Sequence, residues 1–185
     1  MWFDKTLPNN ARCKHGNLSG LADRQWLEKE YLPTLSGDVL FVGVQAYTDF
    51  YHLLAPQAHF TTVDVNPMVA QFGSPHRHFV GTLDDLFDDD LEPYDNIILY
   101  GLFGLDESYI KEPFEIQTLL VRCVLHLRND GRVLFANSTD TMDADQFLSM
   151  PAKAGLSIVE DRRLRPNKKH SEMVILTCQA KKLLI

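Results

Sequence analysis

The chain has 185 residues and a formal net charge of −7; 45% of its residues are hydrophobic and 23% are charged. This length fits a single domain, which can bury about 70% of its unfolded surface and so needs no disulfide or metal to hold a core. The acidic balance disfavours broad binding to the phosphate backbone of a nucleic acid.

The first 36 residues are expected to form an irregular arm followed by one helix, which together make a possible lid. Residues 1–19 contain turn-forming residues and show no hydrophobic period. Ser19 is placed to cap a helix over residues 21–35. The apolar positions of this helix recur at near-helical spacing and are Leu21, Trp26, Leu27 and Tyr31.

From residue 37 to residue 185, strand-like and helix-like patterns alternate and define the second predicted unit. Short apolar and β-branched runs predict strands at 38–44, 59–65, 76–82, 94–101, 132–138, 156–164 and 171–180. Helix-like segments lie between them at 47–56, 66–73, 83–93, 106–128 and 143–155, with a turn predicted at 129–131. This alternation predicts an α/β protein with a doubly wound, mainly parallel seven-stranded sheet, helices on both faces, and an antiparallel pair formed by the last two strands.

Two of these segments carry more specific signals. Asn66 and Pro67 are typical of the cap and the first position of a helix. The segment 106–128 has an apolar helical face made of Leu119, Leu120, Cys123, Val124 and Leu127.

Cysteine usage and hydropathy exclude further classes. Cys13, Cys123 and Cys178 are odd in number and far apart, which predicts free thiols rather than a disulfide framework or a zinc site. No apolar run approaches the ~20 residues of a spanning helix, and residues 1–16 lack the apolar core of a signal peptide. We therefore predict a cytoplasmic protein with no membrane anchor and no metal centre.

Two charged segments allow two interpretations each. His76 and His78 are two residues apart on a predicted strand. They are either a metal-binding pair or part of a solvated strand edge, and we favour the solvated edge. The basic run at 162–170 is either a contact for RNA or an acidic substrate, or a loop that keeps a strand edge soluble, which we favour.

The ligand site of a doubly wound sheet lies beyond the carboxyl ends of its strands. Asp64 ends the second predicted strand, about 20 residues after Gly43, where an acidic side chain can accept hydrogen bonds from ribose hydroxyls. Its alternative role is to cap the helix that begins at residue 66. Gln45 and Tyr47 stand where further glycines would form a pyrophosphate cradle, so we predict a cofactor without phosphates instead of a dinucleotide.

Residues 37–182 resemble class I S-adenosylmethionine-dependent methyltransferases. The matching segments, in family order, are Val39–Tyr47, Thr62–Pro67, Phe79–Leu86, Tyr94–Tyr100, Leu127–Leu134 and Ala154–Glu160. The sequence departs from the family pattern at Phe41, where an acidic residue is usual, and at Gln45 and Tyr47, which replace glycines.

The resemblance implies a set of residues that contact S-adenosylmethionine. By position, these are Gly43, Val44, Gln45 and Tyr47 along the methionine part, Asp64 at the ribose, Val65, Thr82 and Leu83 around adenine, and Tyr100, Gly101 and Leu102 beneath the cofactor near the methyl group.

The function implied by this resemblance is methyl transfer from S-adenosylmethionine to a small-molecule acceptor. Such a transfer needs in-line positioning and a base for the acceptor. The motifs fix no catalytic residue; His15 is a candidate because N-terminal arms close over the substrate in this family. The alternatives are another enzyme that uses the same cofactor, such as an aminopropyl transferase or a lyase, and a non-catalytic binding protein that keeps the fold.

Overall fold

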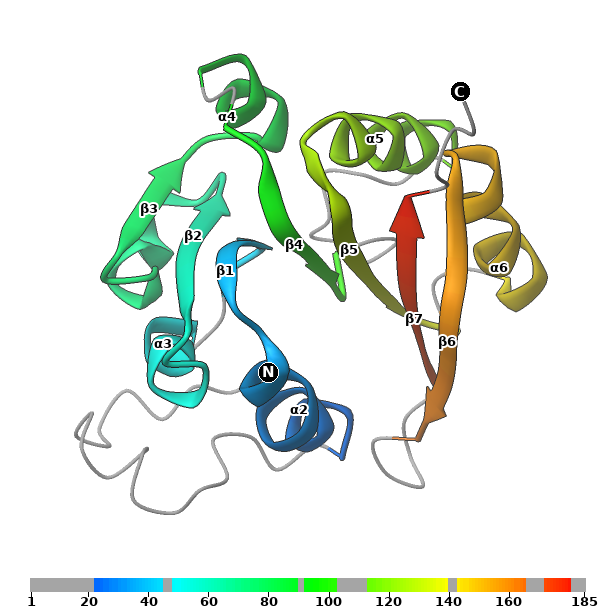
Figure 1. Ribbon diagram of the computed structural model, residues 1–185, viewed down its shortest axis with the longest axis horizontal. Helices are drawn as coiled ribbons and strands as arrows, with labels where there is room; N and C mark the ends of the chain where they lie inside the picture. The colour runs from blue at the N-terminus through cyan, green and yellow to red at the C-terminus, as the bar shows by residue number, and fades with distance from the viewer. Residues whose placement is uncertain are drawn as a thin grey trace.

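Seven strands form one mixed sheet in the order β3-β2-β1-β4-β5-β7-β6 (Figure 1). The computed structural model describes residues 22–44, 48–89, 92–102, 113–139, 143–165 and 172–180. The parallel strands are β1 (Gly37–Val42), β2 (Ala58–Asp64), β3 (Arg77–Val80), β4 (Tyr94–Tyr100) and β5 (Leu127–Ser138). β7 (Met173–Ala180) lies antiparallel between β5 and β6 (Leu156–Leu164). The predicted doubly wound, mainly parallel sheet with an antiparallel final pair is therefore confirmed.

Helices cover both faces of this sheet (Figure 1). One face carries α2 (Ala22–Trp26), which continues as a π-helical turn (Leu27–Tyr31) and a 3-10 turn (Leu32–Thr34). The same face carries α3 (Tyr51–Leu54), which follows a 3-10 turn (Thr48–Phe50). The opposite face carries α4 (Leu83–Asp89), α5 (Pro113–Leu125) and α6 (Ala144–Lys153).

A 3-10 helix (Pro67–Phe72) follows β2, and its start confirms the predicted cap. The Asn66 side chain accepts a hydrogen bond from the Met68 backbone N–H at 3.0 Å, and Pro67 is the first helical residue. This arrangement satisfies one of the donors that a helix start leaves without a partner.

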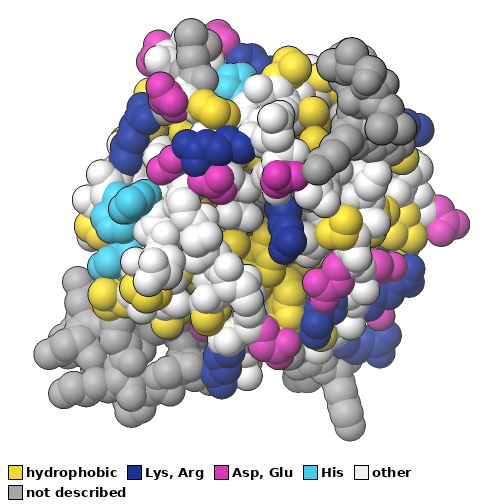
Figure 2. Space-filling view, in the orientation of Figure 1, with side chains coloured by type: hydrophobic (Ala, Val, Ile, Leu, Met, Phe, Trp, Pro, Cys, Tyr) yellow, Lys and Arg dark blue, Asp and Glu magenta, His cyan; other side chains and the backbone are white. Residues whose placement is uncertain are grey.

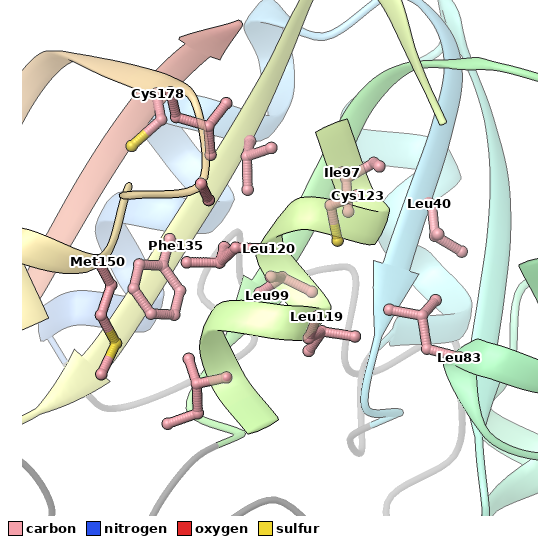
Figure 3. Packing of buried hydrophobic residues seen from close by; sticks show 14 of the residues in the cluster. Leu40, Leu83, Ile97, Leu99, Leu119, Leu120, Cys123, Phe135, Met150 and Cys178 are labelled. Carbon is pink, nitrogen blue, oxygen red and sulfur yellow. The ribbon is translucent and has the colours of Figure 1, made fainter. Parts of the chain in front are cut away.

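The core has two halves, one on each side of the sheet. Along β4, Ile97 and Leu99 face the half beneath α4, α5 and α6, whereas Ile98 and Tyr100 face the half beneath α2 and α3. This two-sided burial explains why the central strands are continuous apolar runs. Figure 3 shows Leu119, Leu120 and Cys123 of α5 close to side chains of the strands in the first half.

α2 and the two turns after it belong to the second half of the core. Leu27 and Leu32 are fully buried, and Trp26 and Tyr31 are nearly so, in line with the apolar positions predicted for this helix. Leu21 lies outside the described residues. Within the described part of the chain, no helix is long and apolar enough to cross a membrane.

The start of β5 corrects the sequence analysis. The turn predicted at 129–131 is wrong, because these residues form a bulged extension of β5: Tyr94 pairs with Leu127, and the next pair is Asn96 with Arg132. Leu127, expected on the face of α5, opens this strand, since α5 ends at Leu125. A Cβ on Gly131 would lie 3.0–3.1 Å from backbone oxygens and a side chain, so glycine allows a close backbone approach there.

Candidate cofactor-binding site

Glycines follow three of the parallel strands at the carboxyl edge of the sheet. Each backbone N–H donates to a carbonyl of the neighbouring strand, namely Gly43 to Val63 at 2.9 Å, Gly81 to Asp64 at 3.0 Å and Gly101 to Ala136 at 2.9 Å. Gly43 has a φ of +82° and Gly101 a φ of +66°, values that side-chain-bearing residues rarely adopt. The chain can therefore leave β1 and β4 abruptly at this edge.

Asp64 joins the end of β2 to the loop that follows β1. Its Oδ2 accepts a hydrogen bond from the Val44 backbone N–H at 2.8 Å, and its Oδ1 accepts one from the Asn66 N–H at 2.8 Å. The residue is half-buried. An ionised carboxylate has roughly four acceptor positions, so each oxygen keeps capacity for a further donor. Asn66 is the residue that caps the following helix. Asp64 instead holds the loop after β1 and the loop after β2 through hydrogen bonds to their backbone N–H groups.

Gly43 and Gly101, the two glycines with positive φ at this edge, differ in which atoms lie next to them. A Cβ on Gly43 would collide with the side chain of Leu102, which packs over this glycine from the end of β4. At Gly101, no atom of the described residues other than its two chain neighbours lies within 4 Å of the equivalent position. Within the described part of the chain, the backbone is thus uncovered where β4 ends, and a leucine covers the backbone where β1 ends.

Thr82 and Asp85 form a reciprocal cap at the start of α4. The Asp85 N–H donates to Thr82 Oγ1 at 3.0 Å, and the N–H and hydroxyl of Thr82 donate to Asp85 Oδ2 at 2.9 and 2.6 Å. The hydrogen bond from the Thr82 side chain is the main cause that lowers the pKa of Asp85. The side chain of Leu83 is buried in the core, whereas Thr82 is exposed. Of these two predicted adenine contacts, Thr82 is therefore the one whose side chain is accessible.

The remaining predicted contacts differ in accessibility. The side chains of Val44 and Tyr100 are buried, with exposed fractions of 7% and 1%, while Val65 is half-buried. Val44 therefore contributes its backbone N–H to this edge. Gln45, Tyr47 and His15 lie outside the described residues.

A buried arginine at this edge was missed by the sequence analysis. The guanidinium carbon of Arg24 lies 4.2 Å from the centre of the Tyr100 ring, and Nη1 donates to the Tyr51 hydroxyl at 3.4 Å. Arg24 is 5% exposed and Glu28, one helical turn later, is 3% exposed. Two opposite charges four residues apart on a helix are neighbours, and this spacing was the signal available in the sequence. The contacts of Arg24 fasten α2 to the carboxyl end of β4.

The histidines beside β3 take part in local hydrogen bonds. Nδ1 of His78 lies 2.9 Å from the Thr62 hydroxyl, and Nδ1 of His76 accepts from the Phe60 N–H at 3.1 Å. Among the described residues, no group of three or more His, Cys, Asp or Glu side chains is arranged to hold a metal ion.

Comparison with solved structures gives the class to which this architecture belongs. A 1,6-didemethyltoxoflavin-N1-methyltransferase of Burkholderia thailandensis, bound to S-adenosylhomocysteine, matches with a TM-score of 0.67 and 16% identity over 94% of this chain and 83% of its own. The N-methyltransferase NodS of Bradyrhizobium japonicum, with S-adenosylhomocysteine, matches with a TM-score of 0.66 and 17% identity over 96% of this chain and 90% of its own. The chain thus has the fold of a class I S-adenosylmethionine-dependent methyltransferase.

Further matches show how widely this fold is used. SMU.776, solved with S-adenosylhomocysteine, has a TM-score of 0.66 and 15% identity over 89% of this chain, which spans about half (51%) of that protein. The matches also include the fibrillarin pre-rRNA processing protein of Methanococcus jannaschii, with a TM-score of 0.59 and 16% identity over 95% of this chain and 77% of its own. No protein-family model and no curated protein sequence matches the chain. The likeness therefore concerns the fold.

Proposed function

We propose that this protein binds S-adenosylmethionine at the carboxyl edge of its sheet and transfers the methyl group to a small-molecule acceptor. The observation that carries the proposal is Asp64, which ends β2 and is hydrogen-bonded to the loop after β1. Both elements contact the ligand in doubly wound folds. The net charge of −7 favours a small acceptor over a nucleic acid.

The residues at this edge fit such a cofactor. The carboxylate of Asp64 is held in place by two backbone N–H groups and keeps acceptor capacity for ribose hydroxyls. Among the described residues, none outside the two chain neighbours covers Gly101, which leaves room for a ligand against the backbone at the end of β4. When bound, S-adenosylmethionine supplies an activated methyl group on a sulfonium.

The chain's own contribution to such a reaction is mainly positioning. Methyl transfer is accelerated by holding donor and acceptor in line. Tyr100 is held under Arg24, which makes the floor of the site rigid. His15 is the proposed base for the acceptor, and Gln45 and Tyr47 are proposed to contact the methionine part.

A non-catalytic binding protein is the second candidate, and Phe41 favours it. This residue replaces the usual acidic side chain of the family, is fully buried, and makes an edge contact with Tyr51 at 5.2 Å between ring centres. Phe41 thus serves the core instead of the ligand site. The buried thiols of Cys123 and Cys178 support a proposed location in the reducing cytoplasm.

The test is calorimetric titration with S-adenosylmethionine and S-adenosylhomocysteine. We expect Asp64→Ala to weaken S-adenosylhomocysteine binding at least about tenfold, because a hydrogen bond to a charged group contributes roughly 1.5–3 kcal/mol. Asp161→Ala on β6 removes an equal charge away from the site and should leave the affinity unchanged. A labelled-methyl screen with metabolite pools and with RNA then identifies the acceptor class.

Two results would contradict the proposal. Absence of heat from both ligands with the folded wild-type protein would exclude cofactor binding. Unchanged affinity in a folded Asp64→Ala variant would exclude the ribose role. Binding of S-adenosylhomocysteine without methyl incorporation into any pool would favour the binding protein over the transferase.

A further inference from the structure

The winding of the sheet reverses between β1 and β4, which lie side by side (Figure 1). The chain passes from β1 outward to β2 and β3, then crosses back to β4 and continues to β5 on the other side. In doubly wound sheets, ligands bind in the crevice beyond the carboxyl ends of the strands at such a reversal. The side chains that cross this crevice therefore decide what can bind there.

Leu102 is a side chain that crosses the crevice. It lies two residues after the end of β4, and its side chain packs on Gly43, directly after β1, so closely that a Cβ on this glycine would collide with it. Leu102 is partly buried and also packs against the core half beneath α4, α5 and α6. These two sets of contacts hold the leucine across the crevice and over Gly43.

A ligand that spans the proposed site has to pass over Gly43. Asp64 ends β2 and Gly101 directly follows β4, and β1 lies between these two strands. Asp64 is also bonded to the Val44 N–H, next to Gly43. A nucleoside whose ribose is held by Asp64 and whose tail reaches Gly101 would therefore need the space that the Leu102 side chain fills.

Gly101, the residue before Leu102, allows the leucine to be turned away. It has a φ of +66°, and no described atom outside its two chain neighbours lies within 4 Å of the position of a Cβ. A glycine can change its backbone angles with few steric limits, and such residues often serve as hinges. The chain thus provides both an obstacle in the crevice and a means of moving it.

We propose that Leu102 is a gate that determines specificity: a tail beyond the ribose binds only when the Leu102 side chain leaves Gly43. The gate rests on the proposed function, because it takes the ligand of the site to be S-adenosylmethionine or its product. Packing on Gly43 and on the core stabilises the closed position. The apparent affinity for a tailed ligand is therefore reduced by the fraction of molecules whose gate is open, and a nucleoside without a tail escapes this cost.

The test compares S-adenosylhomocysteine with adenosine, which has the same base and ribose but lacks the tail. Calorimetry measures both ligands on the wild type and on Leu102→Ala. We expect this variant to bind S-adenosylhomocysteine about three- to tenfold more tightly, because the packing of part of a leucine no longer opposes binding. Its affinity for adenosine should be unchanged.

Two further variants control for packing and folding. Leu102→Val shortens the side chain less, so its affinity for S-adenosylhomocysteine should lie between those of the wild type and Leu102→Ala. Leu148→Ala on α6 truncates another partly buried leucine that packs against the same core half, and it should change neither affinity. Circular dichroism verifies that each variant is folded.

The rate of association provides a second measure. Surface plasmon resonance on the immobilised protein should show that S-adenosylhomocysteine associates faster with Leu102→Ala than with the wild type, because binding no longer waits for the gate to open. The association rate of adenosine should be the same for both proteins.

The outcomes separate the gate from the proposed function. If Leu102→Ala binds S-adenosylhomocysteine as tightly as the wild type or more weakly, Leu102 is a wall of the site and the gate is overturned, while cofactor binding stands. An equal gain for adenosine would also overturn the gate, since the side chain would then not oppose the tail. Absence of binding to the wild type and to every variant would overturn the proposed function and the gate together. Binding of S-adenosylhomocysteine to Leu102→Ala alone would support both.

Discussion

The ring of His76 lies 5.5 Å from that of His52 and 5.7 Å from that of His59, between centres. Figure 2 shows histidines gathered on the side of the molecule where β2, β3 and α3 lie. Desolvation, and then the charges of His52 and His59, lower the pKa of His76. Since Nδ1 of His76 accepts from the Phe60 N–H, the structure requires this ring to be neutral.

This environment predicts that acid destabilises the fold in a particular pH window. In the unfolded chain His76 has its ordinary pKa of 6.5, so as the pH falls the unfolded state takes up the proton first. Stability is full above pH 6.5 and is lost as the pH falls from there through the lower folded-state value. His78 contributes in the same direction, because burial lowers its pKa as well.

Urea unfolding at pH 8 and pH 5.5 measures the loss. His76→Asn keeps an acceptor for the Phe60 N–H and cannot be protonated, so this variant should lose less stability between the two pH values than the wild type. An identical loss in both proteins would show that His76 is not part of the effect.

Single residues also show what the sequence can and cannot predict about the site. Asp64 and Gly43 were located by their distance from each other and by the strands before them, which are local properties. The packing of Leu102 on Gly43 and the role of Arg24 were not predicted, because they depend on β4 meeting the loop after β1 and on α2 crossing Tyr100. Such contacts join segments far apart in the chain.

Among the elements, α6 has a well-defined start. The Asp143 side chain accepts hydrogen bonds from the N–H groups of Asp145 and Gln146, both at 3.0 Å. A carboxylate there also faces the positive end of the helix. The helix then places Phe147 on Phe135 of β5, with ring centres 4.2 Å apart.

We expect Asp143→Ala to lower the free energy of unfolding by about 1 kcal/mol, because two backbone donors lose their acceptor. Asp143→Asn keeps an acceptor oxygen and should lose clearly less. Urea unfolding of the three proteins at neutral pH provides the measurement. Equal stability of the alanine variant and the wild type would mean that water replaces the cap at no cost.

At the level of elements, the start of β5 was the main error of the sequence analysis. Asn129, Asp130 and Gly131 are typical of a tight turn. In the fold they lengthen β5 past Asp95, and Arg128 there binds the carboxylates of Asp38 and Asp95. Tertiary contacts thus override the local preference, whereas the strands in apolar runs agreed with their predicted positions.

The molecule as a whole is built so that each layer of helices covers one face of the sheet. Alternation of patterns was sufficient to predict this, because helices and strands that alternate leave a parallel sheet between two layers. Cys123 and Cys178 lie in the core half beneath α4, α5 and α6. Burial raises the pKa of Cys123 and raises the pKa of Cys178 to about 12.

Thiol reactivity should therefore report unfolding of the whole molecule. In a Cys13→Ser variant, we expect Ellman's reagent to modify neither remaining cysteine in native buffer and both in denaturing urea, because thiolates form only when the core opens. The modification rate should rise with urea in parallel with the loss of circular dichroism. Fast reaction of one equivalent under native conditions would show local opening around that cysteine.

The antiparallel pair also has a consequence for synthesis. β6 precedes β7 in the chain, yet its backbone pairs only with β7 in the described sheet, and β7 lies between it and β5. As the chain leaves the ribosome, β6 emerges as a nine-residue strand with no partner. A run of charged residues, Glu160–Arg163, lies within this strand. Charged side chains oppose pairing with other nascent chains, so we expect them to protect β6 during the interval before β7 is synthesised.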